Sequence, residues 1–268
     1  MSIGFIGFIG CGNMAGAILS GLLSSKTVKE NEINVFDIYS PAVSKLKSQY
    51  EINACENESD VVNKSDIVIL AVKPNVLLSV LEKISKAVKE KNPLLISIAA
   101  GKTTDYIAEP LSSKTRIIRV MPNINAKVGE AICAYTANEN ATDEDKKATE
   151  KIFSFVGEII YLDESFFPLF GVLGGCTPAL AYMFIDELAR AGVKHGMKKD
   201  IALKIAAQAV LGSAKMILES EDHPYDLIDK VCSPGGTTIE AVTSLQSDGF
   251  EAAVHNAVDK AVEKDKLL

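Results

Sequence analysis

The feature that most limits the fold of this chain is an apolar run that leads directly into a cluster of glycines. Residues 3–9 predict a short buried strand, residues 10–16 read Gly-Cys-Gly-Asn-Met-Ala-Gly, and an apolar helical pattern follows. A strand, a G-x-G-x-x-A turn and a helix in this order are typical of a dinucleotide-binding unit, since the second glycine lets the backbone approach a pyrophosphate at the helix N-terminus. We therefore expect cofactor contacts from this turn: Gly10, Cys11, Gly12, Asn13, Met14 and Ala15.

Small residues around this turn are expected to serve packing. Ala15 and Gly16 should let the helix lie close to the sheet, while Gly4 and Gly7 should serve the strand and not a ligand. A glycine turn that binds nothing is the alternative. The order of strand, turn and helix favours the binding site over that alternative.

Composition excludes several classes of protein. The apolar start is shorter than the roughly 20 residues that span a membrane. It also lacks the basic residues that begin a secretory signal peptide, since the first lysine is Lys26. Polar residues such as Asp66 and Asn92 interrupt the later apolar runs, so we expect no membrane segment. A net charge of −7 with three arginines argues against nucleic acid. Five scattered cysteines predict a cytoplasmic protein, and three histidines without ligand spacing predict no metal site.

The distribution of strand and helix patterns predicts two domains. Strands without polar alternation are predicted at residues 3–9, 33–37, 67–72, 94–99, 116–121, 130–136 and 158–162, with amphipathic segments such as 75–91 between them. After about residue 163 only helices are predicted, at 177–196, 198–220, 224–231, 238–246 and 249–264. We therefore expect an α/β fold, with a Rossmann-like parallel-sheet domain at residues 1–163 and an all-α domain at 164–268.

Asp37 ends the second predicted strand, about 20 residues after the glycine turn. A carboxylate there can accept both ribose hydroxyls of NAD and would repel a 2′-phosphate. We therefore expect NADH to be used at least as well as NADPH. An Asx turn before Ser40-Pro41 is the alternative role for Asp37.

Several stretches of the chain resemble the pyrroline-5-carboxylate reductase family. They are Gly-Phe-Ile-Gly-Cys-Gly-Asn-Met at 7–14, Leu-Ala-Val-Lys-Pro at 70–74, Arg-Val-Met-Pro-Asn at 119–123, Ala-Gly-Val-Lys at 191–194, Ala-Gln-Ala-Val-Leu-Gly-Ser-Ala-Lys at 207–215, His-Pro at 223–224 and Ser-Pro-Gly-Gly-Thr-Thr-Ile at 233–239. The resemblance covers nearly the whole chain, and the segment at 233–238 is its most specific part. It implies reduction of 1-pyrroline-5-carboxylate to L-proline by hydride transfer from NADH or NADPH. Further cofactor contacts are expected from Asn57, Ala71, Val72, Lys73 and Pro74.

The segment at 233–238 has both a structural and a functional interpretation. Thr237 and Glu240 have the spacing of a capping box, which predicts a helix start. A glycine-rich helix N-terminus is also a site for a carboxylate. In the family this segment holds the substrate carboxylate and its last threonine hydrogen-bonds the ring nitrogen. The resemblance therefore implies substrate contacts from Ser233, Gly235, Gly236, Thr237 and Thr238, with Thr238 as the catalytic residue.

One segment departs from the family pattern. The family's Ser-Gly-Ser-Gly-Pro-Ala-Tyr corresponds here to Gly-Gly-Cys-Thr-Pro-Ala-Leu at 174–180, and Ile124-Asn125 replaces Thr-Pro. Two alternative functions therefore stay open: a cofactor-binding regulatory paralogue without activity, and a 3-hydroxyacid dehydrogenase with a catalytic lysine such as Lys194 or Lys215. The family also implies dimerisation through the helical domain, and often further assembly to decamers.

Overall fold

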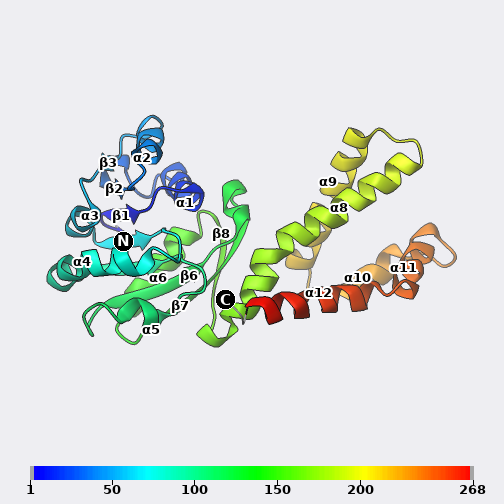
Figure 1. The fold of residues 1–268 in the computed structure, drawn as a ribbon. Coiled ribbons are helices and arrows are strands. Elements are labelled where there is room, and N and C mark those ends of the chain that lie inside the picture. Colours follow the sequence, from blue (N-terminus) through cyan, green and yellow to red (C-terminus); the bar gives the residue numbers. More distant parts are fainter. Residues whose placement is uncertain (1–2, 266–268) are drawn as a thin grey trace. The chain divides into compact units, whose positions relative to one another are not determined.

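The structure, a computed structural model, describes residues 3–265 and consists of two compact units. The units divide between Gly175 and Cys176. In Figure 1 the first unit runs from blue to green, and the second runs from yellow-green to red. The predicted boundary at residue 163 falls just after the last strand, so residues 164–175 are the part of the chain that lies between the two positions.

The first unit is built on one sheet with the order β3-β2-β1-β4-β5-β6-β7-β8. The strands are β1 (Ile6–Ile9), β2 (Ile33–Phe36), β3 (Asn53–Ala54), β4 (Ile67–Leu70), β5 (Leu94–Ser97), β6 (Arg116–Met121), β7 (Ala131–Ala137) and β8 (Gly157–Tyr161). The seven strands predicted from the sequence are all present. The two-residue strand β3 was not predicted, because its residues are exposed and carry no apolar pattern.

The expected parallel sheet is present, with one antiparallel pair of strands in it. β7 runs antiparallel to β6, whereas all other neighbours in the sheet are parallel. The connection explains this, because only residues 122–130 join β6 to β7, with a short 3₁₀ helix, η2 (Ile124–Val128). A parallel pair needs a crossover of a dozen or more residues.

Helices cover both faces of the sheet. They are α1 (Asn13–Ser24), α2 (Ser40–Lys47), α3 (Glu58–Lys64), α4 (Leu77–Lys91), α5 (Thr104–Ala108), α6 (Asp143–Phe153) and the short α7 (Phe167–Phe170). Buried residues of α1, α2 and α6 form one hydrophobic cluster with the sheet, and those of α3, α4 and α5 form a second. Since both faces are covered, the strands consist of nearly continuous apolar runs.

The second unit contains five helices within the described residues. They are α8 (Thr177–Lys194), α9 (Lys199–Glu219), α10 (Pro224–Val231), α11 (Thr237–Ser247) and α12 (Phe250–Asp265). α8 and α9 pack against each other at small residues, and a side chain on Gly192 would meet the Ala202 methyl at 3.1 Å. Asp186 of α8 joins the two helices through an ion pair to Lys199 of α9, and it forms a second ion pair within α8 to Arg190.

Two apolar helices contradict one argument made from the sequence. The helical segments Glu164–Lys194 and Lys199–Glu219 are long and apolar enough to cross a membrane, by length and composition alone. The conclusion that no later run is long enough is therefore wrong. Much of their apolar surface is exposed in the single chain, for instance at Met183 and Leu211.

Candidate functional site

The glycine-rich turn after β1 has the geometry of a binding turn. Gly10 has φ +98°, and a Cβ there would lie 2.5 Å from the Ala71 carbonyl oxygen, so the fold itself requires glycine. A Cβ on Gly12 would meet nothing within 4 Å, which leaves open space where a ligand can approach the backbone. Gly12 is also the N-cap of α1, and no side chain caps that helix. Its first N–H groups are therefore available to an anion.

The packing role assigned to Gly16 is wrong. A Cβ on Gly16 would meet no atom within 4 Å, whereas Ala15 is almost fully buried against the core. The close approach of helix to strand that requires glycine occurs instead at Gly7. A Cβ there would lie 2.4 Å from a Val61 methyl group of α3. The expectation that Gly7 serves the strand is confirmed.

A cleft of about 430 Å³ opens beside this turn at the carboxyl ends of β1, β2 and β4. Six of the predicted cofactor contacts line it: Gly10, Gly12, Asp37, Ala71, Val72 and Lys73. Ligands of open parallel sheets bind in such a crevice. The remaining predicted residues, Cys11, Asn13, Met14, Ala15, Asn57 and Pro74, do not line this cleft.

Asp37 connects the end of β2 to the glycine turn. Its Oδ2 accepts a hydrogen bond from the Cys11 N–H at 2.7 Å, and its Oδ1 accepts one from the Tyr39 N–H at 2.8 Å. The second bond is the Asx turn considered as an alternative. The carboxylate lies in the cleft as well as in that turn. Both roles of Asp37 are therefore compatible with its position.

Two other predicted cofactor residues have clear structural surroundings. Cys11 is buried in the turn, and burial together with the neighbouring Asp37 carboxylate raises the pKa of its thiol to about 12. The thiol is therefore neutral at physiological pH and adds no negative charge beside a phosphate. Asn57 is the N-cap of α3, and its side-chain oxygen accepts a hydrogen bond from the Asp60 N–H at 2.9 Å.

The cleft also contains residues that the sequence analysis missed. Ile38 and Tyr39 follow Asp37, line the cleft and are largely exposed, with Ile38 at 88%. The cleft is also lined by a charged pair: Lys83 of α4 forms a 2.9 Å ion pair with Glu58 of α3. An exposed Ile-Tyr pair directly after a predicted ribose-binding aspartate was a signal for this apolar wall. The ion pair joins residues 25 apart and left no local signal.

The segment at 233–236 forms a tight turn before α11. The Gly236 N–H donates to the Ser233 carbonyl at 2.9 Å, with Pro234 and Gly235 between them, and Gly235 has φ +67°. Proline followed by a residue with positive φ is the signature of a type II turn. Gly236 lies close to Ser233, since a Cβ on Gly236 would come within 3.1 Å of the Ser233 carbonyl oxygen. Local geometry therefore accounts for both glycines.

The predicted capping box at Thr237 and Glu240 is wrong. The turn ends one residue earlier than that motif requires, so Gly236 is the N-cap and Thr237 is already the first helical residue. No side chain caps α11. The N–H groups at its start are therefore available to a carboxylate, as those of α1 are to a phosphate.

Helix starts without a side-chain cap are common in the described part of the chain. Side chains of Asn57, Thr103, Thr142 and His223 cap α3, α5, α6 and α10, whereas α2, α4, α8 and α9 also lack such a cap. What α1 and α11 share is an N-cap glycine in an extended conformation, Gly12 and Gly236. These are the two helix starts at which the sequence predicted a bound anion.

Thr238 lies in the first turn of α11 and lines an apolar pocket of about 460 Å³. The other lining residues are Ser213, Met216, Ile217, Pro224, Leu227, Ile228, Lys230, Val231 and Val242. A threonine hydroxyl at the edge of an apolar pocket can orient a small ring by one hydrogen bond. Within residues 3–265, no group of three or more histidine, cysteine or acidic side chains could hold a metal ion.

Comparisons with known proteins agree with both halves of this description. Residues 164–268 match the family model of pyrroline-5-carboxylate reductase dimerisation. Residues 5–101 match the model of NADP oxidoreductases described as coenzyme F420-dependent. The first match covers the helical unit and the second covers the glycine turn and the cleft.

Individual relatives span almost the entire chain. The pyrroline-5-carboxylate reductase of Escherichia coli is 45% identical over 264 residues, which is 98% of this chain and 97% of that protein. The solved structure of the Coxiella burnetii enzyme superposes with a TM-score of 0.93 at 32% identity, covering 98% of each chain. The Plasmodium falciparum enzyme, solved with NADP bound, superposes with a TM-score of 0.86 at 32% identity. This match covers 100% of this chain and 98% of that one. The chain therefore belongs to the pyrroline-5-carboxylate reductase family.

Proposed function

We propose that this protein reduces 1-pyrroline-5-carboxylate to L-proline with a hydride from NADH or NADPH. The observation that carries this proposal is a pair of open helix N-termini, at α1 and at α11, each preceded by a glycine turn. The first suits the pyrophosphate of a dinucleotide and the second suits the carboxylate of a small substrate. Membership of the family supplies the identity of that substrate.

The dinucleotide fits the residues of the α/β unit. Gly12 leaves room at the backbone for the pyrophosphate, and Asp37 presents a carboxylate in the same cleft for the ribose hydroxyls. When bound, the nicotinamide supplies the hydride for the reaction. Ala71, Val72 and Lys73 line the cleft after β4 and are proposed to hold the part of the cofactor beyond the pyrophosphate.

The helical unit is proposed to hold the substrate. Ser233, Gly235, Gly236 and Thr237 surround the start of α11, where backbone N–H groups can bind the carboxylate. Thr238 is proposed to hydrogen-bond the ring nitrogen. The imine nitrogen binds a proton and retains it, while the carbon of the C=N bond receives the hydride. The protein therefore needs to position the ring and does not need a titrating side chain.

Cofactor preference follows from Asp37. A 2′-phosphate beside this carboxylate would cost about 1 kcal/mol or more in partly solvated surroundings. We propose that NADH is used at least as well as NADPH. The Plasmodium falciparum relative was solved with NADP bound, so both cofactors are to be compared in the assay.

Self-association is proposed to bring a second copy onto the helical unit. The match to a dimerisation model and the exposed apolar residues of α8 and α9 support a dimer. We propose a decamer built from such dimers as the larger assembly. All five cysteines are free, which supports a reducing compartment such as the cytoplasm.

One assay tests the proposed function. Oxidation of NADH and of NADPH is followed at equal concentrations with 1-pyrroline-5-carboxylate, beside a panel of 3-hydroxy acids with NAD and NADP. Turnover of the imine alone is expected. Cofactor binding without turnover would favour the regulatory paralogue, for which the altered segment at 174–177 is the specific observation. Turnover of a hydroxy acid would favour the dehydrogenase.

A further inference from the structure

One face of β6 and its extension carries three residues that contact the same stretch of chain. Arg119 and Met121 alternate along the strand and therefore point to one side, and Asn123 lies two residues beyond the end of the strand. They contact residues 164–174, which we call the connecting segment, in ascending order. Arg119 meets its start, Met121 packs beside Phe170 and Gly171, and Asn123 meets Gly174.

The first contact is an ion pair between a buried arginine and a half-buried glutamate. Arg119 is 5% exposed, and its Nη1 donates to Glu164 Oε1 at 3.0 Å. The Arg119 guanidinium also lies 4.3 Å from the centre of the Phe167 ring. Glu164 accepts two more hydrogen bonds, from the N–H and the hydroxyl of Thr104, each at 2.9 Å. One carboxylate thus joins β6, the start of α5 and the connecting segment.

The last contact lies where the connecting segment becomes irregular. Residues Gly171–Cys176 form a π-helical turn, an uncommon geometry that is frequent at functional sites. Asn123 is 5% exposed, and its Nδ2 donates to the Gly174 carbonyl at 2.9 Å. Its Oδ1 accepts from the Asn125 N–H. The amide therefore holds the π-helical turn to the loop that leaves β6.

The location of these contacts connects them with the chemistry. β6 is parallel to β5, β4 and β1, so its end lies at the same edge of the sheet as Gly10 and Ala71. The connecting segment continues directly into α8, the first helix of the unit that carries Thr238. None of the three β6 residues lines the cofactor cleft.

We propose that Arg119 and Asn123 are positioning residues for hydride transfer, acting through the connecting segment. The proposal rests on the proposed reductase function. The two side chains hold both ends of the segment to the cofactor edge of the sheet and restrict its motion at the entry to α8. Hydride transfer depends steeply on the distance between donor and acceptor carbon, so loss of this restraint lowers the rate of the chemical step more than it lowers binding.

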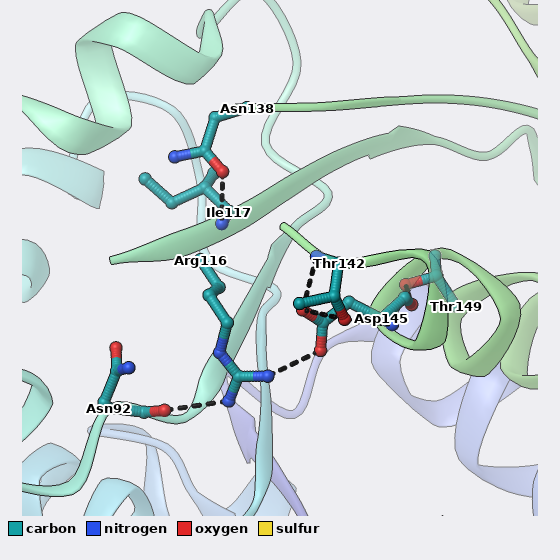
Figure 2. Close-up of polar contacts among 7 residues, drawn as sticks. All are labelled: Asn92, Arg116, Ile117, Asn138, Thr142, Asp145 and Thr149. Atoms are coloured by element: carbon teal, nitrogen blue, oxygen red, sulfur yellow. Dashed lines mark hydrogen bonds and ion pairs between the residues drawn. The ribbon is translucent and has the colours of Figure 1, made fainter. Parts of the chain in front are cut away.

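The same strand offers a matched control at its other end. Arg116 pairs with Leu94 at the start of β5, whereas Arg119 pairs with Ser97 at the end of β5. Figure 2 shows Arg116 between Asp145 and the carbonyl of Asn92, at 2.7 and 2.8 Å. Thr142 caps α6 and donates to the same aspartate. Arg116 therefore stabilises the fold through an ion pair and a bond to a carbonyl. Unlike Arg119, it lies at the edge of the sheet away from the cofactor cleft.

The experiment compares Arg119→Met and Asn123→Asp with Arg116→Met in the full chain. Asn123→Asp keeps the acceptor for Asn125 and removes the donor to Gly174. We measure kcat, KM for both substrates, thermal stability and the primary isotope effect with NADH deuterated at the transferred position. The two proposed positioning variants should lower kcat by about tenfold to a hundredfold, leave both KM values within threefold and raise the isotope effect. Arg116→Met should lower thermal stability with kcat within twofold.

Arg119→Lys provides the rescue. It keeps a charge for Glu164 but lacks the planar stack on Phe167, so kcat should recover in part. An unchanged kcat and isotope effect in Arg119→Met and Asn123→Asp, or an equal loss in Arg116→Met, would overturn the inference while wild-type turnover upholds the function. A wild type without turnover would overturn the proposed function and this inference with it.

Discussion

The two units of this chain bury their apolar residues in opposite ways. In the α/β unit large side chains such as Ile6, Phe8 and Ile69 are fully buried between sheet and helices. In the helical unit the buried residues of α8 and α9 are Pro178, Ala189, Ala202 and Ala206, and none of them has a large apolar side chain. Leu218, by contrast, is 84% exposed. The α/β unit has a core of its own, whereas the helical unit is expected to bury its apolar faces against a second copy.

The energetic consequence is large. Burying one large apolar side chain contributes about 1.5–3 kcal/mol, and many such side chains on α8 and α9 are exposed in the single chain. Continuous exposed apolar surface of this kind marks an interaction face. The difference predicts that folding of the helical unit is coupled to assembly of the protein. The α/β unit should be independent of that process.

The largest effect is expected from separating the units. A fragment of residues 1–175 should fold, bind NADH and have no reductase activity, because Thr238 is absent. A fragment of residues 1–163 should be less stable by about 3–6 kcal/mol, since it loses the buried rings of Phe167 and Phe170. Chemical denaturation and NADH titration measure both. Equal stability of the two fragments would place the domain boundary at residue 163.

The next effect comes from a charge on the exposed face of the helical unit. Leu211→Glu on α9 should shift the protein to monomer in sedimentation at micromolar concentration and abolish most activity, since the charge would be buried on assembly. Val128→Glu is the control, because Val128 is exposed to 75% in the α/β unit. It should leave both assembly and turnover unchanged. A wild type that is monomeric at micromolar concentration would contradict the comparison itself.

A smaller effect is expected at the substrate end. Thr238→Ala should lower kcat/KM by about tenfold to a hundredfold, the cost of one hydrogen bond of about 1–3 kcal/mol, with NADH affinity unchanged. Thr237→Ala is the control for the neighbouring side chain, because it keeps the backbone N–H that is proposed to bind the carboxylate. Because Gly236 is the N-cap of α11, the Thr237 side chain has no capping role, and its loss should change stability by no more than about 0.5 kcal/mol. If neither variant changed kcat/KM, the conclusion would be that the substrate does not bind at the start of α11.

The smallest effect is expected at the cofactor end. Asp37→Ser should leave kcat with saturating NADH nearly unchanged and shift the ratio of kcat/KM toward NADPH by roughly tenfold. The variant also loses the hydrogen bond to the Cys11 N–H, so weaker binding of both cofactors should accompany the shift. A wild-type kcat/KM that is tenfold better with NADPH would contradict the preference. Thr238→Ala and Asp37→Ser together test whether the two units divide substrate from cofactor.

Local sequence patterns were sufficient for most of the fold. Buried strands such as β4 consist of four apolar residues in a row, and the helices of the second unit have long apolar stretches. The direction of β7 was missed although the sequence contained the signal, because the predicted strands 116–121 and 130–136 lie too close in the sequence for a parallel crossover. The start of α11 was misplaced by one residue because the turn at Pro234 and Gly235 determines where the helix begins.

The binding residues divide in the same way. That Gly10, Gly12 and Asp37 line the candidate cleft was predictable, because their positions are local to a turn or a strand end. The contact of Arg119 with Glu164 joins residues 45 apart. Asn123 and Gly174 are 51 apart. No local pattern marks such pairs, since the chain brings them together only when the sheet is complete.

The order of the two units has a consequence for synthesis on the ribosome. The α/β unit is complete at Gly175, and the rest of the chain still has to be translated at that point. At about 5–20 residues per second this takes several seconds or more, which is long enough for a domain of this size to fold. The sheet can therefore form before the apolar helices emerge. The apolar helices are therefore made after the sheet, and we expect their exposed faces to be covered when a second copy binds.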